Sequence, residues 1–342
     1  IVASTSNQTF TTARIRGVGT VGDNPGVESS VGVMIDGVYR PRNGAALGDL
    51  GEVERIEVLK GPQATLFGKN TSAGVINVVT AAPSFDARMA GEATFGDYGT
   101  HGGSVSLTGP IVDEVLAGRL YVAARRRDGL YDVKTGEGPR TSTDDQTEHY
   151  DTVRGQLLWR ATPNLTARLT ADWTERDERC CVGVQIVTGD TAPLLATFAP
   201  DGGVAASPKP WDRTAWSNRD TNTRIREKGL ALHLNADLGW ATLESTSAVR
   251  DWRGVISQDW DFTSADLAYR PDDGSWSNRF RTLTQEFRLS GQNGKLDWSA
   301  GACFADEKLT RRDSLFYGAD YEGYVSRLLS RNSGNPLGDP AH

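Results

Sequence analysis

Apolar and polar residues alternate one by one in several stretches of the chain after Pro83. A period of two places successive side chains on opposite faces of a β-strand. Runs of about nine such residues have the length of a tilted strand that crosses a membrane. The clearest stretches are residues 165–173, 230–238, 282–290 and 296–304. We therefore expect long antiparallel strands in the second part of the chain.

The connections between these strands alternate in length. Short turns are predicted within 109–118, 161–164, 237–240 and 291–295, and long polar segments occupy 132–148, 175–222 and 256–280. Transmembrane barrels have short turns at one end and long loops at the other. Soluble sandwiches have shorter strands and lack this alternation of connection lengths. The pattern predicts about nine barrel strands.

The part of the chain before Pro83 has a different pattern. Short apolar runs are separated by glycine turns, with one helical candidate at 46–56. The runs 55–59 and 74–80 are apolar enough to be buried on both faces of a sheet. The predicted fold class is mainly β, with a small α+β domain over residues 1–83 followed by antiparallel transmembrane β-barrel strands over 84–342.

Composition narrows the class of protein further. The chain has 342 residues, with 37 Lys and Arg against 44 Asp and Glu and a net charge of −7. This acidic balance argues against a nucleic-acid binder, because duplex binding relies on neutralising phosphates. The 28 aromatic residues (9 Trp, 9 Tyr and 10 Phe) and 38 Gly are typical of a turn-rich β protein rather than a disordered chain. The sequence holds no run of about 18 apolar residues, the signature of a transmembrane helix.

Two stretches resemble nucleotide-binding loops but have the wrong spacing or context. Residues 61–70 lack the P-loop pattern G-x-x-x-x-G-K-[ST], because six residues separate the two glycines and Asn70 follows the lysine. Residues 17–22 match G-x-G-x-x-G, but a Pro-Gly pair follows where a dinucleotide site needs a helix. We therefore expect no nucleotide cofactor.

Catalytic and metal-binding patterns are equally weak. The three cysteines form no CxxC pair and the four histidines are scattered, so no zinc site is predicted. No G-x-S-x-G elbow is present, and the carboxylates of 144–149 and 177–181 lie in loops rich in charge. The sequence alone does not decide whether two of these carboxylates form the catalytic pair of a glycosidase. The chain is not predicted to be an enzyme; the alternative is a secreted β-rich carbohydrate-binding protein or hydrolase.

Three motifs in the first domain carry a family resemblance: "ARIRGVG" at 13–19, "VGVMIDGVY" at 31–39 and "GEVERIEVLKGPQATLFGKNTSAGVINVVTAAP" at 51–83. With the strands that follow, they resemble a TonB-dependent outer-membrane receptor, in which a plug domain fills a barrel of about 22 strands. The resemblance implies a plug over 1–83 and the N-terminal part of the barrel over 84–342. On this interpretation the start of the plug, with its TonB box, and the later strands are missing. We therefore expect a fragment of a longer Gram-negative outer-membrane receptor.

The resemblance implies energised uptake of a scarce nutrient, most often a ferric siderophore, and in other members of the family cobalamin, haem or oligosaccharides. The loops would capture the ligand, and TonB, with its inner-membrane energising proteins, would then act on the plug. Outer-membrane lipid and the small-molecule ligand are the other expected partners. We expect a monomer with no cofactor, no metal and no nucleic acid. The complete plug signature disfavours a passive porin-like channel.

The resemblance also assigns roles to plug arginines. Arg16 in "IRG" and Arg55 in "ERIEV" are expected to contact carboxylates of the barrel wall, with ordinary exposed ion pairs as the alternative. Arg40 and Arg42 fall in a predicted apex loop and are candidate contacts for an anionic ligand. Solvated loop charges are the alternative for this second pair.

The long segment 175–222 supplies the remaining candidates. Trp211 and Trp216 are placed either to stack on a ligand or to fold the loop. Cys180 and Cys181 are expected to have a structural role, bonded to each other or to a cysteine elsewhere, which an oxidising compartment permits. Cys303 falls on the polar face of its strand and should face the barrel lumen.

Overall fold

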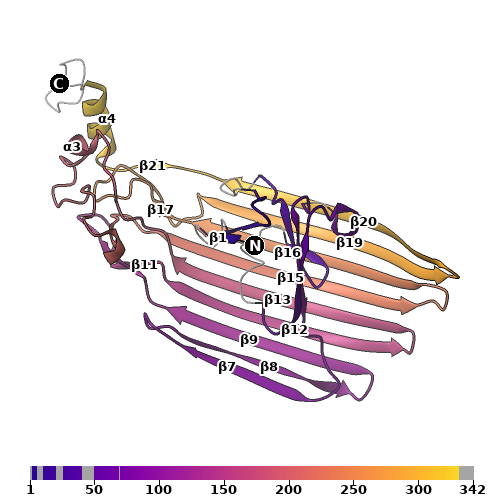
Figure 1. Cartoon of the computed structure of the whole chain (residues 1–342). Helices are drawn as coiled ribbons and strands as arrows, with labels where there is room; N and C mark the ends of the chain where they lie inside the picture. The colour runs from indigo at the N-terminus through magenta and orange to yellow at the C-terminus, as the bar shows by residue number, and fades with distance from the viewer. Residues whose placement is uncertain (1, 6–10, 21–25, 41–49, 69, 331–342) are drawn as a thin grey trace.

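A computed structural model describes residues 2–5, 11–20, 26–40, 50–68 and 70–330. Figure 1 shows a broad sheet of long strands and a smaller body, near the N-terminus, that lies across the sheet. Within the described residues, no helix has the length and apolar character needed to cross a membrane.

Nine long strands form one antiparallel sheet, which we call the wall. Each strand pairs with the next one along the chain, so the predicted strand count and antiparallel pairing are confirmed. The bounds are β7 (Arg88–Phe95), β8 (His101–Val112), β9 (Leu116–Arg127), β12 (Glu148–Thr162), β13 (Leu165–Arg179), β15 (Asn222–Asp237), β16 (Thr242–Ile256), β19 (Ser277–Asn293) and β20 (Leu296–Arg312).

The two ends of the wall differ as predicted. Short turns join the strands at one end, and the long loops at the other end form two small sheets, β11-β10-β14 and β17-β18-β21. We call these folded loops the loop platform, which gathers at one end of the wall in Figure 1. Its elements are β10 (Tyr131–Lys134), β11 (Asp144–Asp145), α3 (Ala192–Leu195), η2 (Pro210–Asp212), β14 (Thr214–Trp216), β17 (Gln258–Asp259), β18 (Ala268–Arg270), β21 (Phe316–Tyr317) and α4 (Tyr321–Ser330).

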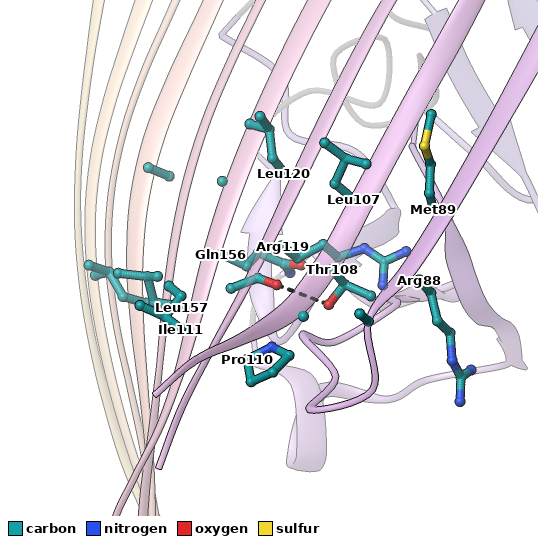
Figure 2. A pocket seen from close by; sticks show the side chains of 16 residues that line it. Arg88, Met89, Leu107, Thr108, Pro110, Ile111, Arg119, Leu120, Gln156 and Leu157 are labelled. Carbon is teal, nitrogen blue, oxygen red and sulfur yellow. Dashed lines mark hydrogen bonds between the residues drawn. The ribbon is translucent and has the colours of Figure 1, made fainter. Parts of the chain in front are cut away.

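The outward face of the wall is apolar although it is exposed. The register places Leu107 opposite Leu120 and Leu157 opposite Leu169, and all four side chains are exposed. Figure 2 shows Leu107, Leu120 and Leu157 around a groove of about 840 Å³ on this face. The inward face carries buried polar residues instead, among them Gln156. This arrangement is the reverse of a soluble sheet and fits a wall with lipid outside.

The smaller body, which we call the plug body, contains a four-stranded sheet with the order β4-β3-β6-β5. The central strands β3 and β6 pair in parallel and are largely buried. The edge strand β5 is half exposed, so the prediction that residues 55–59 are buried on both faces is wrong. The bounds are β1 (Val2–Thr5), β2 (Thr11–Arg14), β3 (Val31–Ile35), β4 (Val38–Arg40), β5 (Val53–Lys60), α2 (Ala64–Phe67) and β6 (Gly74–Thr80).

The glycine-rich segment between β5 and β6 is a turn that returns the chain to the same sheet. At Gly74 a Cβ would lie 2.3 Å from the carbonyl oxygen of Leu59, and its φ is +147°, so only glycine fits here. The helix predicted at 46–56 is contradicted over its described residues, because residues 53–56 belong to β5. The short helix of this region is α2.

Candidate functional site between the plug body and the wall

Four buried charged residues join the plug body to the wall, and we call them the plug seat. Arg40, at the end of β4, donates to Glu227 on β15 at 3.0 Å and lies 3.7 Å from Asp172 on β13. Arg250 on β16 donates to both carboxylate oxygens of Asp172, at 3.0 and 2.7 Å, and to Glu227 at 2.8 Å. None of the four side chains is more than 10% exposed. Two cations and two anions therefore balance in a space closed to water.

Strand register explains how three wall residues that are distant in sequence meet Arg40. Gly229 pairs with Asp172 on one side and with Arg250 on the other. A Cβ on Gly229 would lie 2.2 Å from a guanidinium nitrogen of Arg250, so the glycine leaves room for that side chain to reach Asp172. The seat therefore depends on a small residue at one register position of the wall.

Apolar packing accompanies these charges. Val38 on β4 forms a buried cluster with Ala231 and Ala248, the inward-facing residues of β15 and β16. Removing one member of a buried, charge-paired group costs about 3–5 kcal/mol, because the remaining charge stays buried without compensation. The seat is therefore a strong contact that depends on all four charges.

The turn between β3 and β4 forms a second contact. Asp36 accepts hydrogen bonds from the backbone N–H of Thr80 at 2.9 Å and from its hydroxyl at 2.7 Å. Gln156 of the wall donates to the same hydroxyl at 3.2 Å, and Arg168 lies 3.7 Å from Asp36. This network fixes the end of β6 to the turn and both to the wall.

The residues that precede β5 form the third contact between the plug body and the wall. Arg154 donates to the carbonyl oxygen of Leu50 at 2.7 Å. Glu52 forms an ion pair with Arg119 and accepts a hydrogen bond from the hydroxyl of Ser106 at 3.1 Å. The plug body thus contacts strands β8, β9, β12, β13 and β15 through polar side chains, and it contacts β16 through the apolar side chain of Ala248.

A polar cavity of about 540 Å³ separates the plug body from the wall near the short turns. Its lining includes Arg55 from the plug body and His233, Glu244 and Glu286 from the wall. The ring nitrogen Nδ1 of His233 lies 3.2 Å from the hydroxyl of Thr246. The volume is many times the ~30 Å³ share of one water molecule, so this side of the interface is wet.

The two plug arginines expected to contact the wall lie in exposed positions. Arg55 donates to Glu57 and Glu54 of its own strand, both at 2.8 Å, and its side chain is 51% exposed. Arg16 lies in an exposed turn with φ of 54°, and within the described part of the chain it makes no ion pair to the wall. Wall contact by these two residues stays a prediction.

Arg40 requires a correction. We expected it in an apex loop facing an anionic ligand, but its side chain is 6% exposed and already paired in the plug seat. A guanidinium held between Glu227 and Asp172 has no open face for a ligand. Arg42 lies outside the described residues.

The two loop tryptophans differ in exposure. Trp211, in η2, is 92% exposed. Trp216 ends β14, which pairs with β10, and the ammonium of Lys134 lies 5.2 Å from the centre of its ring. Trp216 therefore helps to fold the loop, whereas a stacking role for Trp211 stays a prediction.

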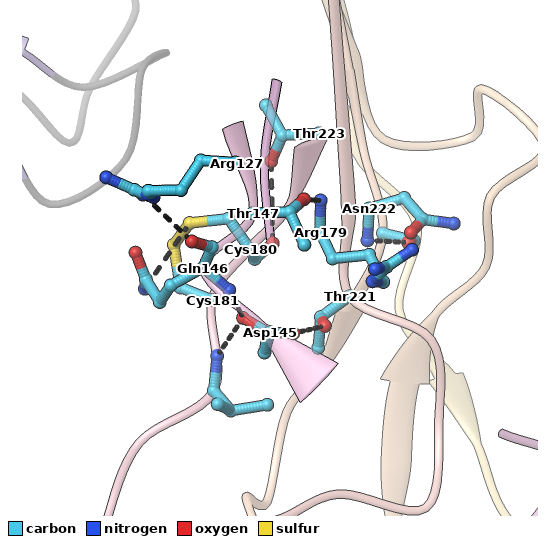
Figure 3. The surroundings of a disulfide bond; sticks show 12 residues. Arg127, Asp145, Gln146, Thr147, Arg179, Cys180, Cys181, Thr221, Asn222 and Thr223 are labelled. Carbon is cyan, nitrogen blue, oxygen red and sulfur yellow. Dashed lines mark hydrogen bonds between the residues drawn. A yellow bond between two sulfur atoms is a disulfide. The ribbon is translucent and has the colours of Figure 1, made fainter. Parts of the chain in front are cut away.

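A disulfide bond joins Cys180 to Cys181 where β13 enters the loop platform, as Figure 3 shows. The side-chain amide of Gln146 donates to the Cys180 sulfur at 3.8 Å, and Asp145 accepts from the backbone N–H of Val182 at 3.1 Å. Residues on both sides of the disulfide thus contact one short loop segment. Cys303 is a free, exposed thiol paired in register with Glu286.

Buried polar groups also hold the loop platform together. Arg140 has a side chain with no exposed surface and donates to Asp145 at 3.0 Å and to Thr221 at 2.7 Å. Asp259 is equally buried, but it accepts from backbone N–H groups, including that of Asn218 at 2.9 Å. The Arg140–Thr221 and Asn218–Asp259 hydrogen bonds join segments that are far apart in the sequence.

Burial, together with the smaller effect of the neighbouring carboxylate of Asp261, raises the pKa of Asp259 to about 7. Burial also raises the pKa of Asp261. Hydrogen bonds from the hydroxyls of Ser217 and Thr263, and then from backbone N–H groups, lower the pKa of Asp259 and Asp261, but desolvation of the charged form outweighs them. The loop platform therefore contains a carboxylate that titrates near neutral pH.

The three wall residues of the plug seat, Asp172, Glu227 and Arg250, were not identified from the sequence. Asp172 lies on the polar face predicted for 165–173, and the same alternation places Glu227 and Arg250 on the inward face. Charged residues on an inward face were the available signal. Their common partner, Arg40, is more than a hundred residues away in sequence and could not be inferred from the pattern.

A plug body seated against the polar inward face of an outwardly apolar wall defines the architecture of a plugged outer-membrane barrel. Residues 1–75 match the family model described as the TonB-dependent receptor plug domain. The resemblance to TonB-dependent receptors that the motifs indicated is therefore confirmed.

Two curated relatives illustrate the sequence similarity. The pesticin receptor of Yersinia pestis is 32% identical over 130 residues, which are 37% of this chain and 19% of that protein. The ferric enterobactin receptor PirA of Pseudomonas aeruginosa is 30% identical over 152 residues, which are 41% of this chain and 19% of that protein. The matched part is thus about a fifth of each relative.

Solved structures extend the likeness to the fold. The ferric yersiniabactin uptake receptor FyuA from Yersinia pestis has a TM-score of 0.65 at 18% identity, covering 90% of this chain and 45% of that one. The siderophore receptor PiuA from Acinetobacter baumannii has a TM-score of 0.60 at 15% identity, covering 88% and 42%. The chain therefore shares their fold of plug and barrel strands and spans less than half their length.

Proposed function

We propose that this chain is part of a TonB-dependent receptor that imports a ferric siderophore across the outer membrane. The observation that carries the proposal is the plug seat, which holds a plug body against the polar inward face of the wall. Relatives described as ferric enterobactin and ferric yersiniabactin receptors support iron–siderophore complexes as the class of ligand. The plug domain of this proposal covers residues 1–83, and the barrel part covers 84–342.

Ligand capture is assigned to the loop platform. Trp211 presents an almost fully exposed ring there, and aromatic rings of this kind stack on flat ligand groups. Arg213 follows two residues later in the sequence, and its guanidinium donates a hydrogen bond to the hydroxyl of Tyr98 at 2.9 Å. These residues offer an aromatic surface and a cation for an anionic iron complex.

Release toward the periplasm requires the plug body to move. TonB, driven by its inner-membrane partners, supplies the force in this proposal. The plug seat resists that force through charge-assisted hydrogen bonds, which re-form when the plug body returns. The wet cavity beside Arg55 lies where the plug body already stands away from the wall, so movement there breaks fewer direct contacts.

Deletion of the gene tests the proposal. Growth under iron limitation is measured with ferric hydroxamate, ferric catecholate and mixed-ligand siderophores, and cobalamin-dependent growth serves as the control. We expect use of one siderophore class to be lost and cobalamin use to be unchanged. The restored gene should recover growth in a strain with TonB and fail to do so in a strain without it.

Unchanged growth on every siderophore would contradict the proposed substrate class. Outer-membrane fractionation and a gel mobility that changes on heating are expected of the protein itself. A chain that remains monomeric and soluble in detergent-free buffer would support the alternative of a secreted β-rich protein.

A further inference from the structure

Five cations gather on the outward face of the wall, toward the loop platform. We call Arg253, Arg279, Arg281, Lys308 and Arg312 the outward basic cluster, and they line a cavity of about 360 Å³. They come from the neighbouring strands β16, β19 and β20. The plug seat and the loop platform use none of these residues.

The register brings like charges directly opposite one another. Arg253 pairs with Arg279, and Arg281 pairs with Lys308. Like charges in such cross-strand positions are destabilising unless an anion lies between them. Repeated on adjacent strands, this arrangement favours a negatively charged group between the side chains.

The chain itself neutralises little of this charge. Asp251 accepts from Arg279 at 2.8 Å and lies 3.8 Å from Arg281. Within the described residues, Arg253, Lys308 and Arg312 form no ion pair, and all three are exposed. Several positive charges are thus left for an external partner, on a chain whose net charge is −7.

An apolar groove continues from the cluster. The groove has a volume of about 540 Å³ and shares Arg281 and Lys308 with the cavity. Its apolar lining is Leu230, Val249 and Leu283, and Lys228, Asp251 and Asp306 are the other charged side chains at its border with the cluster. A ligand that fills both spaces has an acyl chain joined to a charged head. That chemistry favours a lipid over a free ion or a nucleic acid.

We propose that the outward basic cluster binds the phosphate groups of an anionic lipid in the outer leaflet of the membrane. The inference rests on the proposed function, because it requires the outward face to contact lipid. The cluster lies where the apolar band ends on the loop side, the level of the lipid headgroups. Guanidinium groups bind phosphate through paired N–H donors, which suits the arginines of the cluster.

Binding of labelled diphosphoryl lipid A to the full chain in dodecyl maltoside micelles tests the proposal. Each basic residue near an anionic membrane surface contributes about a fivefold change in affinity, so Arg281→Gln, Lys308→Gln and Arg312→Gln combined should weaken binding about a hundredfold. Added salt should weaken wild-type binding more than binding of the triple variant. Unlabelled phosphatidylglycerol and inorganic phosphate serve as competitors, and we expect neither to match diphosphoryl lipid A.

Arg311 and Arg312 provide a matched control. They are adjacent on β20, but Arg311 faces inward beside Asp313, whereas Arg312 lines the outward cavity. Arg312→Gln should weaken lipid binding about fivefold, and Arg311→Gln should leave it unchanged. Equal losses in the two variants, or displacement of the lipid by inorganic phosphate, would overturn the proposal.

Neutral phosphatidylcholine vesicles separate this inference from the proposed function. Variants that enter these vesicles to the wild-type extent are correctly folded. A wild-type chain that enters them but shows no preference for phosphorylated lipid contradicts the lipid site alone. A chain that does not enter them contradicts the membrane wall, and the lipid site with it.

Discussion

In the plug seat every buried carboxylate faces a guanidinium, whereas in the loop platform Asp259 and Asp261 face mainly backbone N–H groups. Both regions hold together segments that are distant in the sequence. The seat has the balanced charges of Arg40, Arg250 and their two partners. The platform contains Asp259, which forms no ion pair within the described residues and has a pKa raised to about 7.

This difference in charge pairing predicts how the plug seat and the loop platform each lose their internal contacts. Loss of one charge in the seat leaves another buried without a partner, so the seat should fail as a unit. The platform should respond to protons, because burial favours the neutral form of Asp259. In the proposed receptor, this division would hold the plug body firmly and leave the loops adaptable.

The largest effect is expected from Arg40→Met. The variant removes one cation and leaves the seat with a net negative charge, so contact between the plug body and the wall should weaken by about 3–5 kcal/mol. Urea titration with protease cleavage of the plug body as readout measures the change. Adding Glu227→Gln to Arg40→Met restores charge balance and should recover part of the loss. No recovery would show that the charges are not coupled.

The second effect concerns the paired part of the loop platform. Arg140→Met leaves Asp145 buried without its cation, and we expect a loss of about 3 kcal/mol in the local stability of the loops. Amide hydrogen exchange in 128–147 and 180–221 should accelerate about a hundredfold, while the plug body is unaffected. Arg213→Met, an exposed arginine in the same loops, is the control and should exchange at the wild-type rate.

The third effect depends on pH. The folded pKa of Asp259, about 7, is above its unfolded value of 3.8, so the folded loops bind an extra proton. The stability that this proton gives to the folded loops is fully present below pH 3.8, and it is lost as the pH rises through about 7. The groups around it are Asp261, Arg219 and Asp266, which forms an ion pair with Arg219.

Hydrogen exchange, corrected for the intrinsic effect of pH, should show loops at least about tenfold less protected at pH 8 than at pH 5, since each pKa unit is worth ~1.4 kcal/mol. Asp259→Asn removes the titration and should flatten this dependence. A steep dependence retained in that variant would assign the proton to another group.

The smallest effect is expected from Arg55→Met. This arginine is half exposed and pairs only with Glu54 and Glu57 on its own strand within the described residues, so its ion pairs are screened by water. The urea titration used for Arg40 should show no resolvable change. A loss as large as that of Arg40→Met would place the main plug contact at Arg55 and reverse the comparison.

The orientation of side chains could be predicted from strand periodicity along one segment of the sequence. Contacts between residues that only the folded chain brings together could not be predicted. Leu169 and Asp172 fall on opposite faces as the alternation predicted, because a strand fixes the direction of each side chain. Arg40 could not be placed, because its environment is set by Glu227 and Asp172. Burial of β5 was overestimated, because an apolar run does not reveal whether its strand is central or at an edge. The parallel pairing of β10 with β14 joins separate loops and left no periodic signal.

β4 of the plug body packs against the inward face of β15 and β16, and the seating of the plug body depends on this contact. The most direct test replaces Val38 and Ala248 with cysteine in a Cys303→Ser background, in isolated membranes. We predict a disulfide between positions 38 and 248, and none when Val249→Cys, on the outward face of the same strand, replaces Ala248→Cys. Failure of the first pair to cross-link under oxidant, with both thiols free to react with maleimide, would contradict the account.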